Sequence, residues 1–132
     1  MKKKLIIALV MVLAIVSLSA CSGMTTVESI KSEIFTDEAY QDAVTECQTF
    51  LSDWEGITVK KISYAGDDAV YADAEVRGEK PENLIILLVT FETDDEDHQN
   101  GLEPGTVYEN YTFTFTRSDF TMPWEHKDHG YG

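Results

Sequence analysis

The stretch Leu84–Phe91, with the sequence LIILLVTF, decides the fold of this chain. Seven of its eight residues are apolar, and an apolar run of this length without alternation is typical of a β-strand that is covered on both faces. The run is bounded by Pro81 on one side and by a polar segment on the other, so it is shorter than a typical core helix. We therefore expect this strand to lie in the centre of a sheet.

Strands are also predicted after this stretch. Val107–Arg117 alternates between the two faces of a half-buried antiparallel strand. Its apolar face comprises Val107, Tyr111, Phe113 and Phe115, and its polar face comprises Thr112, Thr114 and Thr116. Ser118–Pro123 is expected to turn the chain, and Trp124–His129 can then form a last short strand.

The region before the central stretch is less regular. A strand is predicted over Ile57–Tyr64, but its apolar residues change parity, which requires either a bulge near Lys60 and Lys61 or burial on both faces. For Ala69–Val76 the residues favour a strand and a short helix about equally, because Ala and Glu favour a helix whereas Val and Tyr favour a strand. Both alternatives stay open.

An amphipathic helix is predicted from Asp37 to Asp53, where Thr36 can cap the first amides. Cys47 falls inside the apolar stripe of this helix, so we expect it to be a buried core residue rather than a nucleophile. Residues of the stripe recur at intervals of three and four: Tyr40, Ala43, Val44, Cys47, Phe50, Leu51 and Trp54.

The N-terminus has the layout of a secretory signal peptide. Met1–Lys4 is positively charged, Leu5–Val16 is apolar, and small residues lead into Cys21. The apolar run is shorter than the ~20 residues of a membrane-spanning helix. Leu18-Ser19-Ala20-Cys21 resembles the lipobox of bacterial lipoproteins, which implies cleavage between Ala20 and Cys21 and attachment of a diacylglyceryl group to the Cys21 sulfur. The resemblance predicts a lipid-anchored protein on the extracytoplasmic face of the cell membrane.

This interpretation divides the chain into three segments. We expect a signal peptide over 1–20, a lipidated tether over 21–35 and a single domain over 36–132. The formal charge is −14 for the whole chain, and loss of the three signal-peptide lysines makes it −17. Such acidity disfavours nucleic acid as a partner and favours solubility, cations or a basic partner.

Four segments resemble small lipoproteins of Gram-positive gut bacteria that carry a domain of unknown function with a cystatin-like or nuclear-transport-factor-two-like fold. These segments are Phe50–Tyr64, Ile85–Thr93, Tyr108–Arg117 and Trp124–Gly132. The resemblance implies an α+β fold in which one main helix packs in the concave face of a curved antiparallel sheet. It implies no activity. The sequence departs from this pattern at Ala69–Lys80, where the family has a stronger second helix.

Two groups of residues carry metal-ligand chemistry. Asp94, Asp95 and Asp97 offer oxygen ligands for calcium, but an EF-hand register with Gly101 at position six places Val107 at position twelve, where a carboxylate is required. The histidines His98, His126 and His129, with Asp128, could bind zinc. A spacing of three within a strand puts His126 and His129 on opposite faces. We therefore expect no metal site and no cofactor.

Three functions remain open. The first is a non-catalytic binding or interaction module on the membrane surface, with a protein or small molecule as its partner. The second is a small enzyme or ligand-binder whose cone-shaped pocket uses His129 or Asp128 as a base. That pocket would be lined by Tyr64, Phe91, Tyr111, Phe113, Trp124 and His129. The third is an immunity-type inhibitor whose acidic face masks a basic toxin. We favour the first, because the sequence contains no GxSxG, HExxH or phosphate-binding glycine motif.

Overall fold

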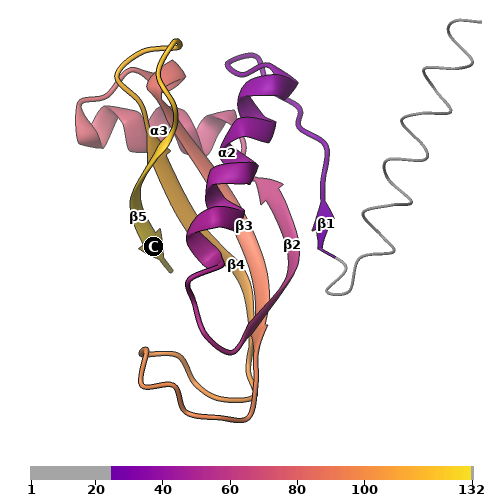
Figure 1. The fold of residues 1–132 in the computed structure, drawn as a ribbon. Helices are drawn as coiled ribbons and strands as arrows, with labels where there is room; N and C mark the ends of the chain where they lie inside the picture. Colours follow the sequence, from indigo (N-terminus) through magenta and orange to yellow (C-terminus); the bar gives the residue numbers. More distant parts are fainter. Residues whose placement is uncertain (1–24, 132) are drawn as a thin grey trace, which may run out of the picture.

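The computed structural model describes residues 25–131 of the chain (Figure 1). The predicted signal peptide 1–20, the bond between Ala20 and Cys21, and the lipidation of Cys21 lie outside the described residues. The fold is α+β, with two helices packed on an open five-stranded sheet of order β1-β2-β3-β4-β5. Among the described residues, no helix has the length and apolar character to cross a membrane.

β3 (Leu84–Thr93) is the central strand of the sheet, which confirms the prediction from LIILLVTF. It pairs antiparallel with β2 (Ile57–Tyr64) on one side and with β4 (Val107–Thr116) on the other. Five of its side chains are fully buried: Leu84, Ile85, Leu87, Val89 and Phe91.

Each face of β3 is covered by a different helix (Figure 1). α2 (Asp37–Leu51) lies over the face that carries Leu87 and its cross-strand partner Phe113, which contacts Phe50 at a ring distance of 6.1 Å. α3 (Asp67–Arg77) lies on the opposite face, beside Ile86 and Leu88. The unbroken apolar run is therefore explained by burial on both sides of the sheet.

The local sequence accounts for both helices. Thr36 caps α2, since its hydroxyl oxygen accepts a hydrogen bond from the Ala39 amide at 3.1 Å. Cys47 is fully buried on the sheet side, where burial raises the pKa of its thiol to about 12, so the prediction of a core cysteine is confirmed. Ala69–Val76, for which the sequence left a strand and a helix open, lies in the helix α3. This helix ends at Arg77 and is capped by Gly78, whose φ is 69°.

Bulges account for the irregular strands. The register of β2 shifts between Val59 and Lys61, which confirms the bulge predicted near Lys60 and Lys61. In β4 an extra residue lies near Asn110, whose φ is 53°. This bulge reverses the alternation, so that Tyr108 stacks on Phe91 with ring centroids 5.0 Å apart. Val107, predicted on the buried face, is instead 52% exposed.

The residues before α2 differ from the expected arrangement. β1 (Thr26–Val27) pairs parallel with β2, so the sheet is mixed rather than wholly antiparallel. Phe35 is buried, and Ile30 and Ile34 pack against the core. Of the segment 21–35, expected to be a tether, residues 25–35 are thus part of the folded domain. The parallel pairing was not predictable from a two-residue strand, because two residues show no periodicity.

Candidate functional site

A bulge in β5 (Glu125–Gly130) determines where the C-terminal histidines point. In the pairing with β4, Asp128 lies opposite Thr114 and His126 lies opposite Phe115, so Lys127 is an extra residue. The bulge places His126 and His129 on the same face, with Nε2 of His126 2.9 Å from Nδ1 of His129. The prediction of opposite faces is therefore wrong, because it assumed a regular strand.

The two imidazole rings complete an aromatic layer under the C-terminal end of α2. His126 stacks on Phe50, with ring centroids 4.0 Å apart and ring planes 8° apart. His129 contacts Trp54 at 5.1 Å and Tyr111 at 6.1 Å. Burial lowers the pKa of His126, and the neighbouring His129 lowers it further. Its neutral form, which is favoured by this environment, suits a ring packed among aromatic side chains.

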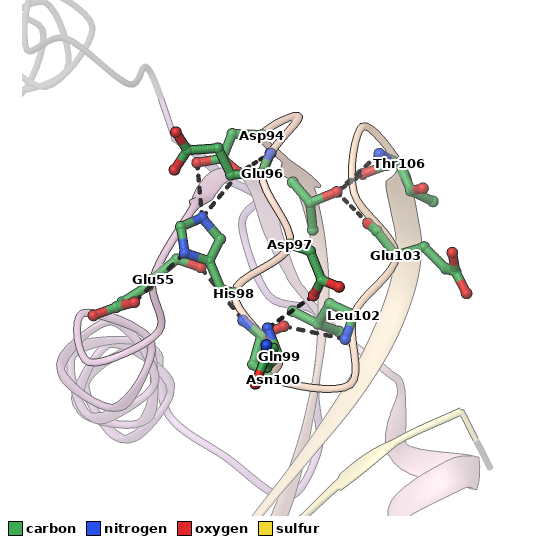
Figure 2. Close-up of polar contacts among 11 residues, drawn as sticks. Glu55, Asp94, Glu96, Asp97, His98, Gln99, Asn100, Leu102, Glu103 and Thr106 are labelled. Carbon is green, nitrogen blue, oxygen red and sulfur yellow. Dashed lines mark hydrogen bonds and ion pairs between the residues drawn. The ribbon is translucent and has the colours of Figure 1, made fainter.

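The loop between β3 and β4 is fastened to the turn that follows α2 (Figure 2). Nε2 of His98 lies 3.0 Å from both carboxylate oxygens of Asp94, and Nδ1 lies 3.5 Å from a carboxylate oxygen of Glu55. The hydrogen bond with Asp94 is the main cause that raises the pKa of His98, and the charges of Asp94, Glu55 and Glu96 add to it. His98 therefore links the acidic loop to the rest of the domain.

Gly56 makes room for this link. A Cβ atom at residue 56 would lie 2.3 Å from Nε2 of His98, and the φ of 74° also favours glycine. The backbone carbonyl of Gly56 accepts a hydrogen bond from the Asp94 amide at 2.8 Å. The Trp-Glu-Gly segment at 54–56 thus supplies a ring, a carboxylate and a close approach to the loop.

A pocket of about 470 Å³ lies between the α2–β2 turn, the acidic loop and the edge formed by β4 and β5. Its wall toward the sheet is aromatic, with the rings of Trp54, Tyr111 and His129. Its rim is polar and carries the carboxylates of Asp53 and Glu55. The complete lining consists of Asp53, Trp54, Glu55, His98, Asn100, Gly101, Leu102, Tyr111 and His129. We refer to it as the aromatic–acidic pocket.

The residues expected to line a pocket are divided between three places. Tyr111 and His129 line the aromatic–acidic pocket. Phe91, Phe113 and Trp124 lie in the core, with at most 3% of their surface exposed. The Tyr64 hydroxyl donates to Asp67 at 2.6 Å, at the start of α3.

Of the two bases considered for catalysis, Asp128 lies on the other face of the sheet. Its carboxylate accepts a hydrogen bond from Arg77 at 3.1 Å, and both residues line an open groove of about 550 Å³ between α3 and the sheet. The same carboxylate also accepts a hydrogen bond from the backbone amide of His129 at 2.9 Å, and His129 lines the groove as well as the aromatic–acidic pocket. Arg77 holds the Asp128 carboxylate on the groove side of the sheet, whereas the His129 ring packs against Trp54 and Tyr111 on the other side.

Three metal-ligating residues come together at one place among the described residues. Asp94, Glu96 and His98 each offer one ligand atom, and these atoms lie within 4.8 Å of one another. Asp95 and Asp97, the other candidate ligands, are not members of this group; Asp97 accepts a hydrogen bond from the Gln99 amide at 2.9 Å. Within this group, Nε2 of His98 already contacts both carboxylate oxygens of Asp94.

Comparison of the chain with models of protein families, with curated proteins and with solved structures found no match. The resemblance to lipoproteins with a cystatin-like or nuclear-transport-factor-two-like domain stays a prediction. A fold does not by itself determine a function, so the residues of the site carry the functional inference.

The link through His98 predicts a specific pH dependence. The pKa of His98 in the folded protein is expected above ~6.5, the ordinary value for histidine. A group whose pKa is raised by folding stabilises the folded state fully at pH values below its pKa in the unfolded chain. This stabilisation is lost as the pH rises through its pKa in the folded protein. At the acidic end the pKa of Asp94 is lowered, so its contribution is lost as the pH falls through that value. The pair therefore stabilises the domain most between the unfolded pKa values of aspartate (~3.9) and histidine (~6.5), and the stabilisation falls off outside this range toward the two folded values.

Titration of the His98 ring signals by nuclear magnetic resonance (NMR) measures this directly. Asp94→Asn should return the midpoint toward the ordinary value, whereas Asp95→Asn removes the same charge from the same loop and should leave the midpoint nearly unchanged. Equal effects of the two substitutions would show that the net charge of the loop, and not the contact, sets the pKa.

Proposed function

We propose that this protein is a membrane-anchored surface lipoprotein whose domain is a non-catalytic binding module, with the aromatic–acidic pocket as its ligand site. The observation that carries the proposal is the pocket itself, in which an aromatic wall faces a polar, acidic rim. Small-molecule sites are commonly concave, of ~300–1,000 Å³, and combine apolar or aromatic walls with a few polar groups. The pocket of about 470 Å³ has this composition and size.

The elements around the pocket favour a preformed site. The aromatic wall is fixed by ring contacts, and the rim is held by the His98 link and by the amide of Asn100, which donates to the Glu55 carbonyl at 3.5 Å. A wall that is rigid before binding reduces the entropy cost of ordering side chains around a ligand. Binding therefore needs little rearrangement of the domain.

The anchor rests on the lipobox resemblance at Leu18–Cys21. The described fold begins at Thr25, whose hydroxyl donates to the Val59 carbonyl at 2.9 Å. Four residue steps from Cys21 to Thr25 span at most ~14 Å. A lipidated Cys21 would therefore hold the β1 edge of the domain close to the lipid headgroups, so that ligands are bound near the membrane surface.

Substitution of Cys21 tests the anchor. Full-length Cys21→Ser, expressed in a bacterium that processes lipoproteins, is expected in the aqueous phase of a detergent extract with an altered N-terminal mass, because no lipid can be attached. Ser22→Ala keeps the cysteine and should partition like the parent. Detergent partitioning and mature mass of Cys21→Ser equal to those of the parent would contradict the proposal.

Blocking the pocket tests the binding function. A panel of benzyl alcohol, benzoate, benzylamine and choline is added at millimolar concentration to the full chain in detergent micelles, and the indole NH signal of Trp54 is followed by NMR. At least one compound is expected to shift this signal. Leu102→Trp and Asn100→Trp place a ring in the pocket and should each abolish the shift.

Val76→Trp is the matched control, because residue 76 is 85% exposed on α3, away from the pocket. Thermal unfolding of each variant establishes that it is folded. The binding proposal fails if no compound shifts the Trp54 signal, or if the shifts persist in both folded pocket variants.

A further inference from the structure

We infer that the aromatic–acidic pocket selects organic cations, in particular alkylated ammonium groups. The inference rests on the proposed binding function and adds the chemical class of the ligand. Three features of the pocket carry it: the rings of its aromatic wall, the charges of its rim and the contacts that leave one carboxylate available.

The aromatic wall presents the groups that attract a cation. Trp54 and Tyr111 both line the pocket and contact each other with ring centroids 6.2 Å apart. The negative face of an aromatic ring attracts a cation within ~6 Å of its centroid, and tryptophan is the best partner. Both rings are half-buried, so they are held in the wall and still reach the cavity.

The charges on the rim have one sign. Asp53 and Glu55 line the pocket from the α2–β2 turn, and its lining contains neither lysine nor arginine. The loop that supplies His98 also contains Asp94, Asp95, Glu96 and Asp97, of which Asp94 and Glu96 lie beside His98 (Figure 2). With a formal charge of −14 for the whole chain, this rim attracts cations and repels anions.

The imidazole ring of His98 already occupies part of this rim, and its contacts are unequal. It lies 3.0 Å from both oxygens of Asp94 but 3.5 Å from Glu55. The Glu55 side chain is 80% exposed, so it can turn toward a ligand while Asp94 keeps the loop fastened. Glu55 is therefore the carboxylate that would face a bound ammonium group.

The wall and the rim together define the ligand. A bare metal ion prefers oxygen ligands and gains little from aromatic rings, whereas a neutral apolar molecule gains nothing from the carboxylates. An ammonium ion with methyl or benzyl substituents uses both parts of the pocket. Its alkyl groups cover the aromatic wall, and its charge is balanced at the rim.

A matched pair of probes tests the inference. Choline and 3,3-dimethyl-1-butanol have the same shape, but the second carries a neutral carbon in place of the charged nitrogen. Each is titrated into the full chain in detergent micelles, and binding is read from the indole NH signal of Trp54, assigned by its loss in Trp54→Phe. Choline is expected to bind at least about fivefold more tightly.

Glu55→Gln should weaken choline binding severalfold and leave binding of the neutral probe unchanged. Glu79→Gln removes the same charge from an exposed position after α3 and should alter neither. Equal affinity for the two probes would overturn the cation inference and leave the binding function standing. Absence of a choline shift would also overturn it, and the panel with benzyl alcohol and benzoate then decides separately whether the pocket binds any ligand.

Discussion

Burial of β3 on both of its faces is the constraint on which the rest of the structure depends. α2 covers one face and α3 the other, while β2 and β4 satisfy its backbone hydrogen bonds. Each fully buried Leu, Ile, Val or Phe side chain contributes ~1.5–3 kcal/mol relative to an exposed one. Because β3 cannot move without exposing these side chains, the loop that follows it starts from a fixed position beside the end of α2.

The aromatic–acidic pocket arises where the strands depart from a regular ladder. The bulge near Asn110 turns Tyr108 toward Phe91, and the bulge at Lys127 brings His129 to Trp54 and Tyr111. If β5 continued from His126 without the extra residue, His129 would lie opposite Thr112 on the other face, and the wall would lose its imidazole ring. Bulges at a sheet edge commonly direct a side chain toward a site, and here one of them completes the aromatic wall.

Sequence patterns predicted the elements that contain several periodic residues. α2, the bulge in β2 and the central position of β3 follow from patterns of seven or more residues. The bulge in β5 could not be predicted, because Lys127 lies in a polar run without alternation. In β4 the exchanged parity of Tyr108 and Glu109 was the signal of a bulge, and the regular alternation from Tyr111 onward concealed it. The site was predicted only in part for the same reason. Tyr111 and His129 belong to strands, whereas Trp54, Glu55 and His98 meet through tertiary contacts between a turn and a distant loop.

The orientation of His129 is the feature that most directly tests this account. Nuclear Overhauser effects between the His129 ring protons and the ring protons of Trp54 and Tyr111 measure it in solution. The structure predicts effects to both rings, together with effects between His126 and Phe50. Effects from the His129 ring to Val76 on α3, with none to Trp54, would place the ring on the opposite face and contradict the account.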